Sequence, residues 1–441
     1  MRAAVIVPVV AGALLLIAVG ALLLGDRDPV EPAPTPERGE TTTTTTPVAT
    51  PIDASTTKLD PAADTPVVEP PPRAVEAVLA DLAAALRRGD VAAARALLAE
   101  LRRHVVPPPV ADERNAALVY QRAFDLIAAR EDWPPALDRL LAGESLSADD
   151  VALLQAWRTE NADVFALLRD AARLPESRFP LDYEAGAAML LPHVAPSIKA
   201  AKMLRAESRL MELAGDPIGG LESAWAGLEM AEAVRGDPIL VSQLVGHVLD
   251  GITANALQGA LDPRAPELAA YLDAFDETSL RAAFQRSLIG EVYSFLPDAL
   301  DGGIEGVEGP IRSADMAVYV ESIAEAWALA ERPYAEVREP FEAFDRRAAE
   351  APGIAGYLMP AAARAAAQTA KAEGRIAMMR AALALERYRA KHGRYPERFD
   401  APADPLTGRP FEYAPVDGGY RLSNEPDDAN LRLEFWSAKR D

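Results

Sequence analysis

The sequence predicts a mainly α-helical protein: an irregular α-solenoid or helical bundle of stacked hairpins, with a small C-terminal α+β module. Apolar residues recur with the 3.6-residue period of a helix from Arg73 onward, and strand signals are absent across residues 73–355. Three short strand patterns follow the last helical pattern. The chain divides into four parts: an apolar segment (1–25), a linker (26–72), a helical body (73–355) and a C-terminal module (356–441).

The first part is the most hydrophobic stretch of the chain. No residue from Ala3 to Gly25 is charged, and a helix of this length would be about 34 Å long, enough to cross a hydrocarbon core of roughly 30 Å. Because Arg2 lies at its start, we expect a single-pass anchor in the inner (cytoplasmic) membrane. The N-terminus would lie in the cytosol and the bulk of the chain in the periplasm or another extracytoplasmic space. The alternative is a cleaved signal peptide, with Val19-Gly20-Ala21 as its cleavage site.

The second part is rich in proline and threonine. It contains the run Thr41–Thr46 and almost no aromatic or large aliphatic residue. Such a segment buries too little apolar surface to offset the entropy of ordering it. It is therefore predicted to be a disordered linker with extended polyproline character.

Gly-Asp pairs divide the helical body into hairpins. Gly89-Asp90 follows one amphipathic segment and precedes another, so that the glycine would end a helix and the aspartate would cap the next. The same pair returns at Gly215-Asp216 and Gly236-Asp237. The hairpins resemble those of tetratricopeptide-like repeats, although their spacing is irregular and the consensus Trp, Tyr and Pro positions do not match.

Two irregular segments interrupt these hairpins. Prolines between Pro175 and Pro196 break the helical pattern, which predicts loops or short helices there. Asp301–Pro310 is predicted to be a flexible acidic loop. Long helices are expected again over residues 313–347.

Composition excludes some classes of partner. The net charge of −22 argues against binding to nucleic acid or to anionic lipid head groups, both of which require basic surfaces. The chain has no cysteine, which excludes disulfides and a lipidated cysteine. A body of this size can bury enough core without covalent cross-links.

No catalytic motif stands out among the titratable residues. The four histidines, His104, His193, His247 and His392, lack the spacing of a zinc site. His193 is the most suggestive, because Asp182, Tyr183 and Glu184 lie upstream on the same irregular stretch. A catalytic His–Asp pair is one interpretation, and a histidine that caps a helix or fills a polar gap near the surface is the favoured one.

Two further residues lie in strongly apolar segments. His247 is expected to be a satisfied core histidine. Glu291 interrupts an apolar run, so burial would either raise its pKa or require an arginine partner such as Arg286 or Arg281. We favour the structural ion pair, and we assign no catalytic, cofactor-binding or metal-binding residue.

The C-terminal module has the most specific pattern. A helix over roughly 361–391 is followed by Gly393, and then by strand patterns at Pro410–Pro415, Tyr420–Ser423 and Leu431–Trp436. Several positions match a known family, and they are Leu385 and Tyr388, His392-Gly393-Arg394-Tyr395-Pro396, Asp404-Pro405, Gly408, Pro410, Phe411, Tyr413 and Tyr420-Arg421-Leu422-Ser423. On these residues the module resembles the globular head of type II secretion major pseudopilins, which implies one long helix against a small antiparallel sheet. The whole arrangement looks like membrane-anchored exported proteins predicted from bacterial genomes.

The chain also departs from that family. It lacks the cleavable leader and methylation motif of a pseudopilin, and its module lies some 330 residues from the apolar segment, so polymerisation is not expected. The family also binds calcium through acidic loops near the C-terminus, where this chain has Glu425, Asp427 and Asp428. Pro426 and a shortened loop favour a solvated acidic turn instead.

We therefore expect a membrane-anchored extracytoplasmic helical protein that acts as a protein-interaction or scaffolding module without a cofactor. Its partners would be other extracytoplasmic or membrane proteins, and not nucleic acid. One alternative is an accessory component of a secretion or pilus-like assembly. Another is an extracytoplasmic enzyme that lacks a short motif and uses buried carboxylates.

Overall fold

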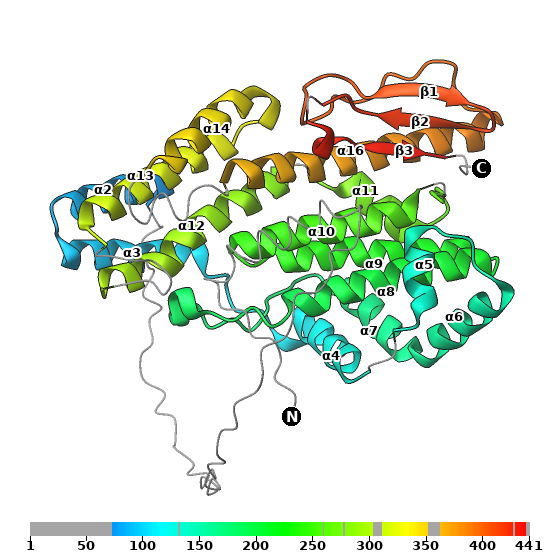
Figure 1. Cartoon of the computed structure of the whole chain (residues 1–441), viewed down its shortest axis with the longest axis horizontal. Coiled ribbons are helices and arrows are strands. Elements are labelled where there is room, and N and C mark those ends of the chain that lie inside the picture. Colours follow the sequence, from blue (N-terminus) through cyan, green and yellow to red (C-terminus); the bar gives the residue numbers. More distant parts are fainter. Residues whose placement is uncertain are drawn as a thin grey trace, which may run out of the picture.

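Helices form nearly the whole body, and the prediction of a mainly α protein with a small C-terminal sheet is confirmed (Figure 1). The computed structural model describes residues 73–437, except 131, 132, 259, 277, 303–310, 352–361 and 427. The first helices are α2 (Val75–Arg87), α3 (Val91–Val105), α4 (Ala116–Ala129), α5 (Pro135–Ala142), α6 (Ala148–Glu160) and α7 (Ala162–Ala172). The next are α8 (Val194–Leu213), α9 (Pro217–Arg235), α10 (Leu240–Leu257), α11 (Pro266–Ala274) and α12 (Thr278–Leu300). The last are α13 (Ser313–Ala330), α14 (Tyr334–Ala349) and α16 (Ala362–His392).

Two of the three Gly-Asp pairs form the predicted turns. Gly89 and Gly215 have φ values of +70° and +85°, a left-handed conformation that glycine adopts without steric cost. The next residues cap the following helices: Asp90 accepts a hydrogen bond from the Ala93 amide at 3.0 Å, and Asp216 accepts one from the Gly219 amide at 3.0 Å. The pairs α2–α3 and α8–α9 are therefore helical hairpins.

The third pair was predicted wrongly. Gly236 has φ −59° and remains right-handed, and the Asp237 carboxylate turns into the protein, where it lies 2.7 Å from His193 Nε2. This turn also approaches α12 closely. A Cβ added at Gly290 would lie 1.7 Å from the carbonyl oxygen of Pro238, so only glycine fits there. The α9–α10 turn is therefore a buried packing element.

Three antiparallel helices, α8, α9 and α10, form the centre of the body (Figure 1). Helices α4 and α7 pack on one side of them, and α12 and α16 pack on α10. Polar contacts also join these layers, because Arg169 of α7 pairs with the buried Glu207 of α8 at 2.7 Å, and Ser223 of α9 donates to the same carboxylate at 2.7 Å. At the far end of the molecule, the hairpin α2–α3 packs against α12 and α13.

The irregular stretch between α7 and α8 is confirmed. It contains one short 3₁₀ helix, η3 (Tyr183–Ala188), which packs against α12. Further 3₁₀ turns are η2 (Asp112–Arg114) and η5 (Ala429–Leu431).

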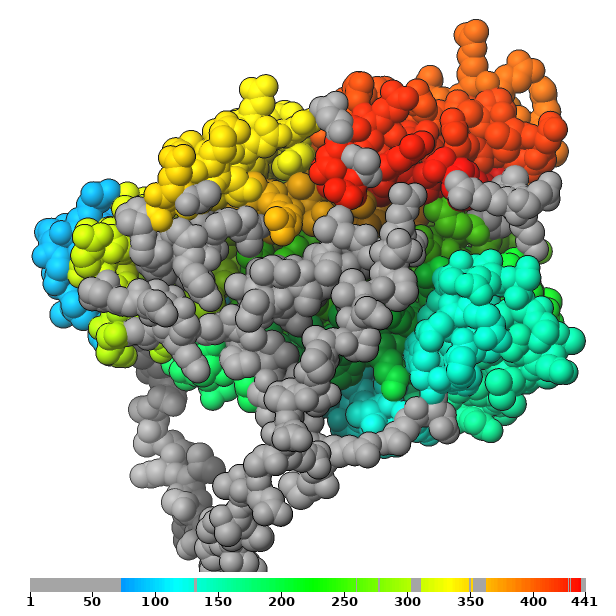
Figure 2. Space-filling model, viewed as in Figure 1, coloured from blue at the N-terminus to red at the C-terminus, as the bar shows by residue number. Residues whose placement is uncertain are grey.

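The C-terminal module forms as predicted, with strand ends shifted by up to three residues. The antiparallel sheet has the order β1 (Glu412–Val416), β2 (Gly419–Ser423), β3 (Glu434–Trp436) and packs on α16, which ends just before the left-handed Gly393. Figure 2 shows this module, orange to red, along the upper edge of the molecule near α14. Helix α16 also packs on α10, α12 and α14, so it belongs to the cores of both the module and the body.

Both edges of the sheet carry features that oppose the addition of another strand. The Tyr420 amide and carbonyl both form hydrogen bonds to Ser437, on the side of β3. Pro415, which lies opposite Tyr420 on β1, therefore has its nitrogen on the outer edge of the sheet. As a proline it offers no N–H to another strand there. At the other edge the Gln258 side-chain amide donates to the Glu434 carbonyl at 2.7 Å and accepts from the Trp436 amide at 3.0 Å. The Gln258 side chain thus satisfies the backbone groups of β3 to which a fourth strand would bind.

The expectation of a transmembrane helix is wrong for the described chain, in which none of the helices is both long enough and apolar enough to cross a membrane. The apolar segment 1–25, on which that expectation was based, lies outside the described residues, as do the linker 26–72 and most of the acidic loop 301–310.

A buried polar cluster joins α9, α10 and α16. Arg235 and Asp250 form an ion pair of 2.6 Å, with both side chains 1% or less exposed. Burial alone would raise the pKa of Asp250, but the Arg235 guanidinium holds it below its usual range. From α16, Thr369 lies 3.1 Å from His247 Nε2, and Arg375 donates to the His247 carbonyl at 3.3 Å. Burial lowers the pKa of His247, so its ring is neutral at neutral pH.

The Arg235–Asp250 pair should therefore dominate stability. We expect Arg235→Met to reduce the free energy of unfolding by about 3–5 kcal/mol, because the Asp250 charge would remain buried without its main partner. Urea denaturation at neutral pH measures this. Arg264→Met, which removes an equally short pair with Asp262 at the surface, is the matched control and should leave stability nearly unchanged. An equal loss in both variants would contradict the assignment.

Candidate functional site

The histidines that the sequence analysis considered do not meet. His193 is buried, stacked on Phe179 with 4.0 Å between ring centroids, and pairs with Asp237, so the expectation that it lies near the surface is wrong. His247 lies in the core, as expected, beside Thr369. His104 is on α3, and the exposed His392 stacks on Tyr388 at the end of α16.

The acidic residues near His193 have other contacts. Asp182 caps η3 by accepting from the Glu184 amide at 3.1 Å, and Glu184 forms an exposed ion pair with Arg102 at 3.0 Å. The His–Asp pair in the structure is thus between His193 and Asp237, and it is closed in by Phe179 rather than open to a substrate.

Glu291 is half-buried and pairs with neither of the arginines considered for it. Its Oε1 accepts from the Leu240 amide at 3.0 Å, at the start of α10, whereas Arg281 lies 3.6 Å from Glu373. Burial raises the pKa of Glu291 to about 7, and the hydrogen bond from Leu240 only partly opposes this. The predicted ion pair is therefore wrong, and the predicted rise in pKa is the alternative that the structure supports.

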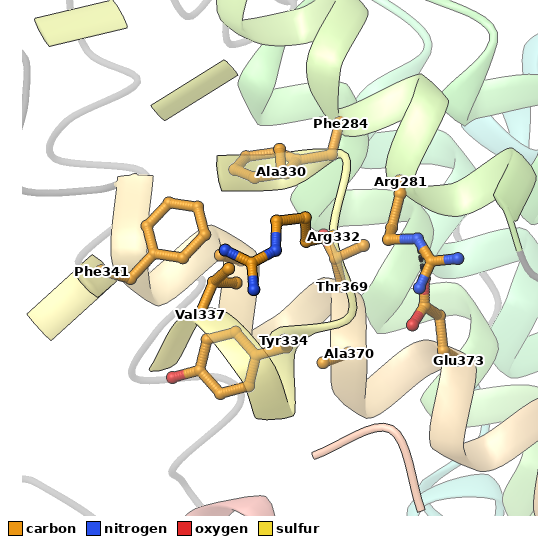
Figure 3. Close-up of a pocket in the computed structure, with 11 residues that line it drawn as sticks. Arg281, Phe284, Ala330, Arg332, Tyr334, Val337, Phe341, Thr369, Ala370 and Glu373 are labelled. Atoms are coloured by element: carbon orange, nitrogen blue, oxygen red, sulfur yellow. Dashed lines mark ion pairs between the residues drawn. The ribbon is translucent and has the colours of Figure 1, made fainter. Parts of the chain in front are cut away.

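A first pocket lies between α12, α14 and α16 (Figure 3). The rings of Phe284, Tyr334 and Phe341 surround it, and the Arg281–Glu373 pair lies at one end. Its volume is about 10 Å³, enough for about one water molecule. This pocket is a packing gap between helices.

A second, larger pocket, which we call the acidic pocket, lies between α4, α7, α9 and the segment 174–177. Its volume is about 190 Å³. The lining residues are Ala116, Tyr120, Ala171, Ala172, Leu174, Pro175, Glu176, Ser177, Glu229, Glu232, Ala233 and Gly236. Small apolar residues thus form much of its wall, and three carboxylates and two hydroxyls form its polar part.

Glu229 is the carboxylate that no cation neutralises among the described residues. Its hydrogen bond comes from the neutral Trp225 Nε1, at 3.0 Å. Burial raises the pKa of Glu229 to about 7, the Trp225 hydrogen bond lowers it, and the neighbouring charge of Glu232 raises it further. Near neutral pH this side chain is therefore divided between its neutral and its charged form.

The other two carboxylates of the acidic pocket have partners. Glu232 accepts from Arg235 at 2.9 Å and from the Tyr271 hydroxyl at 3.3 Å. Glu176 pairs with Arg114 on the surface. Glu229 is therefore the carboxylate of this pocket that remains available to pair with a cation.

Two hydroxyl groups of the pocket have no hydrogen-bond partner among the described residues. Tyr120 is only 1% exposed, and the charge of Glu229 adds to the effect of burial in raising the pKa of its hydroxyl. The Ser177 Oγ is likewise buried and unpaired. Buried polar groups without a partner are uncommon, and in a pocket they indicate a place for polar atoms of a ligand.

The acidic pocket suits binding more than bond cleavage. Ser177 has no base within hydrogen-bond distance in the described chain, and Glu232 is held by Arg235. One free carboxylate and two hydroxyls instead form a set of acceptors for a cationic group with N–H donors.

The described residues contain no group of three His, Cys, Asp or Glu side chains that could hold a metal ion. At the proposed calcium-type turn, Glu425 is exposed, with its carbonyl bonded to Arg409, and Asp428 accepts from the Asn430 amide at 2.9 Å. Asp427 lies outside the described residues.

Sequence reasoning missed the acidic pocket because its polar groups are far apart in the chain. Tyr120, Ser177 and Glu229 come from α4, the segment before η3, and α9. One local signal was present: Glu229 lies within an otherwise apolar turn of α9, beside Met230 and four residues after Trp225. A glutamate in that position requires either a partner or a pocket.

The pH dependence of stability tests the burial of Glu291. The folded protein holds a proton on Glu291 between pH 4.5 and about 7, where the unfolded chain has released it, so stability falls as the pH rises through this window. Glu291→Gln keeps the acceptor for Leu240 and removes the titration. We expect the variant to gain about 3 kcal/mol over the wild type at pH 8 and nothing at pH 4.

Chemical denaturation at both pH values measures this difference. Glu339→Gln, on the exposed side of α14, is the control and should show no such difference. A gain for Glu291→Gln that is the same at both pH values would contradict a buried, titrating carboxyl group.

Comparisons with known proteins add no assignment. Neither a protein-family model, nor a curated protein, nor a solved structure matches this chain. The resemblance of the C-terminal module to a pseudopilin head therefore stays a prediction.

Proposed function

We propose that this protein is an interaction module that binds a cationic group of its partner in the acidic pocket. The observation that carries this proposal is the Glu229 carboxylate, which has no cationic partner among the described residues and lines the same pocket as Tyr120 and Ser177, whose hydroxyls are unpaired. Each of these groups gains a hydrogen bond when an ammonium or guanidinium group enters.

The rigidity of the wall supports a binding role. Tyr120 stacks on Phe124, with 6.2 Å between ring centroids, and the α9 side of the pocket is fixed by the buried Arg235–Asp250 pair. A preformed site loses less entropy on binding than one that must be ordered by its ligand. Because the pocket already has its volume without a ligand, little rearrangement is required.

The charge of the whole chain favours the same class of partner. A net charge of −22 attracts cations over distances of about a Debye length, and this raises the rate of encounter with a basic partner. The stacked helical hairpins supply a rigid frame around the pocket, which agrees with an interaction or scaffolding role by analogy with helical repeat proteins.

A fluorescent glycine-rich peptide with one central lysine tests the proposal. We expect the full-length chain to bind it in an anisotropy titration at pH 8 and low salt, and to ignore the same peptide with a central glutamate. Glu229→Gln should weaken binding at least about tenfold, because a charge-assisted hydrogen bond is worth about 1.5–3 kcal/mol.

Glu76→Gln is the matched control, since it removes one negative charge from an exposed position on α2, far from α9 (Figure 1). It should bind like the wild type. Equal binding of the lysine and glutamate peptides, or an equal loss in both variants, would contradict the proposed function.

A further inference from the structure

We propose that the acidic pocket exchanges the proton of Glu229 for the terminal ammonium group of an unbranched alkylamine. This inference rests on the proposed function and adds to it the chemical class of the ligand and a proton that leaves when the ligand binds.

The volume and lining of the pocket indicate an alkyl chain with one cationic end. Its apolar wall is formed by small or short side chains, namely Ala116, Ala171, Ala172, Leu174, Pro175 and Ala233. Such a wall suits methylene groups and offers no polar atom to a second charged group along the stem. The acceptors, Glu229, Tyr120 and Ser177, are the groups left for a head with N–H donors, and an ammonium group has three such donors.

The proton balance follows from the surroundings of Glu229. Burial raises the pKa of its carboxyl group to about 7, so at slightly acidic pH the empty pocket holds a neutral carboxylic acid. An alkylamine arrives as an ammonium ion and keeps its own protons. The Glu229 proton passes to the solvent, and the carboxylate that remains pairs with the ammonium group. At slightly acidic pH, neither the empty nor the occupied pocket therefore contains an uncompensated charge on Glu229 or on the amine.

The other charged and titratable groups around Glu229 favour this exchange. On α9, Glu232 adds a negative charge, although Arg235 compensates it and Arg286 of α12 lies near enough to interact with it. On α4 and α11 the neighbours are the hydroxyls of Tyr120 and Tyr271, and burial raises the pKa of both well above its usual value, so that they stay neutral.

On the segment 174–177, Glu176 is paired with Arg114. The Arg173 guanidinium lies 5.8 Å from the centroid of the Trp225 ring and is paired with Glu222. Glu229 is therefore the group in the pocket whose pKa lies near 7 and which has no cationic partner among the described residues.

Two sources could supply this ligand chemistry: a free aliphatic amine, or the lysine side chain of a polypeptide. Both present an ammonium group on an unbranched methylene chain. We therefore use n-butylamine and a glycine-rich peptide with one lysine as separate probes, with 1-butanol (no charge) and tetramethylammonium (no N–H donor) as controls.

Calorimetric titration of the full-length chain with n-butylamine tests the exchange. At about pH 6.5, two buffers with different ionisation enthalpies should reveal the release of about three-quarters of a proton per amine bound, and at about pH 8.5 release should be near zero. The association constant should rise about tenfold between pH 6 and pH 8. 1-Butanol and tetramethylammonium should not bind.

Variants distinguish the contribution of the Glu229 carboxylate to binding from the contributions of its neighbours. Glu229→Gln should lose at least about tenfold in affinity at pH 8, together with the pH dependence and the proton release. Tyr120→Phe, which keeps the carboxylate, should weaken binding a few-fold and still release the proton. Glu76→Gln should behave like the wild type, and thermal unfolding of each variant establishes that it is folded.

The possible outcomes distinguish this inference from the proposed function. Amine binding without proton release, or with the same pH dependence in Glu229→Gln, would overturn the exchange and leave the binding function intact. Absence of binding by the amine and by the lysine peptide would overturn both. Tighter binding of the peptide or of the free amine would support the exchange and identify the source of the ligand.

Discussion

The buried ion pair between Arg235 and Asp250 is the interaction on which most of the structure depends. It joins α9 to α10 at the centre of the body, and the same cluster reaches α16 through His247 and Arg375. Two buried charges tolerate little displacement, because each would otherwise lose its partner in a medium of low polarity. This one cluster thus holds α9, α10 and α16 in position relative to one another, together with the sheet that packs on α16.

The same arginine also sets the properties of the acidic pocket. One nitrogen of Arg235 binds Asp250, and another binds Glu232 on the pocket wall. The positive charge of Arg235 thereby compensates the charge of Glu232. Glu229, one turn earlier on the same helix face, accepts a hydrogen bond only from the neutral Trp225. Two glutamates three residues apart therefore differ in chemistry, because a core residue reaches one of them and not the other.

Helical periodicity and turn residues were sufficient to predict much of the fold. The hairpin turns at Gly89 and Gly215, the end of α16 before Gly393 and the three strands all depend on local rules, which the sequence displays directly. The packing of the Gly236 turn against α12 could not be predicted, because the two segments are more than fifty residues apart in the chain. The acidic pocket could not be predicted for the same reason, because it forms only where α4, α7 and α9 meet in the folded protein.

The two edges of the C-terminal sheet affect whether copies of this protein can associate through their strands. An open strand edge is a template onto which a second sheet, or a fibril, can add. Here Pro415 removes the donor on one side, and the Gln258 side chain already occupies the groups on the other. Both features oppose the merging of sheets between two folded molecules, and pairing along β3 would first require the module to separate from Gln258.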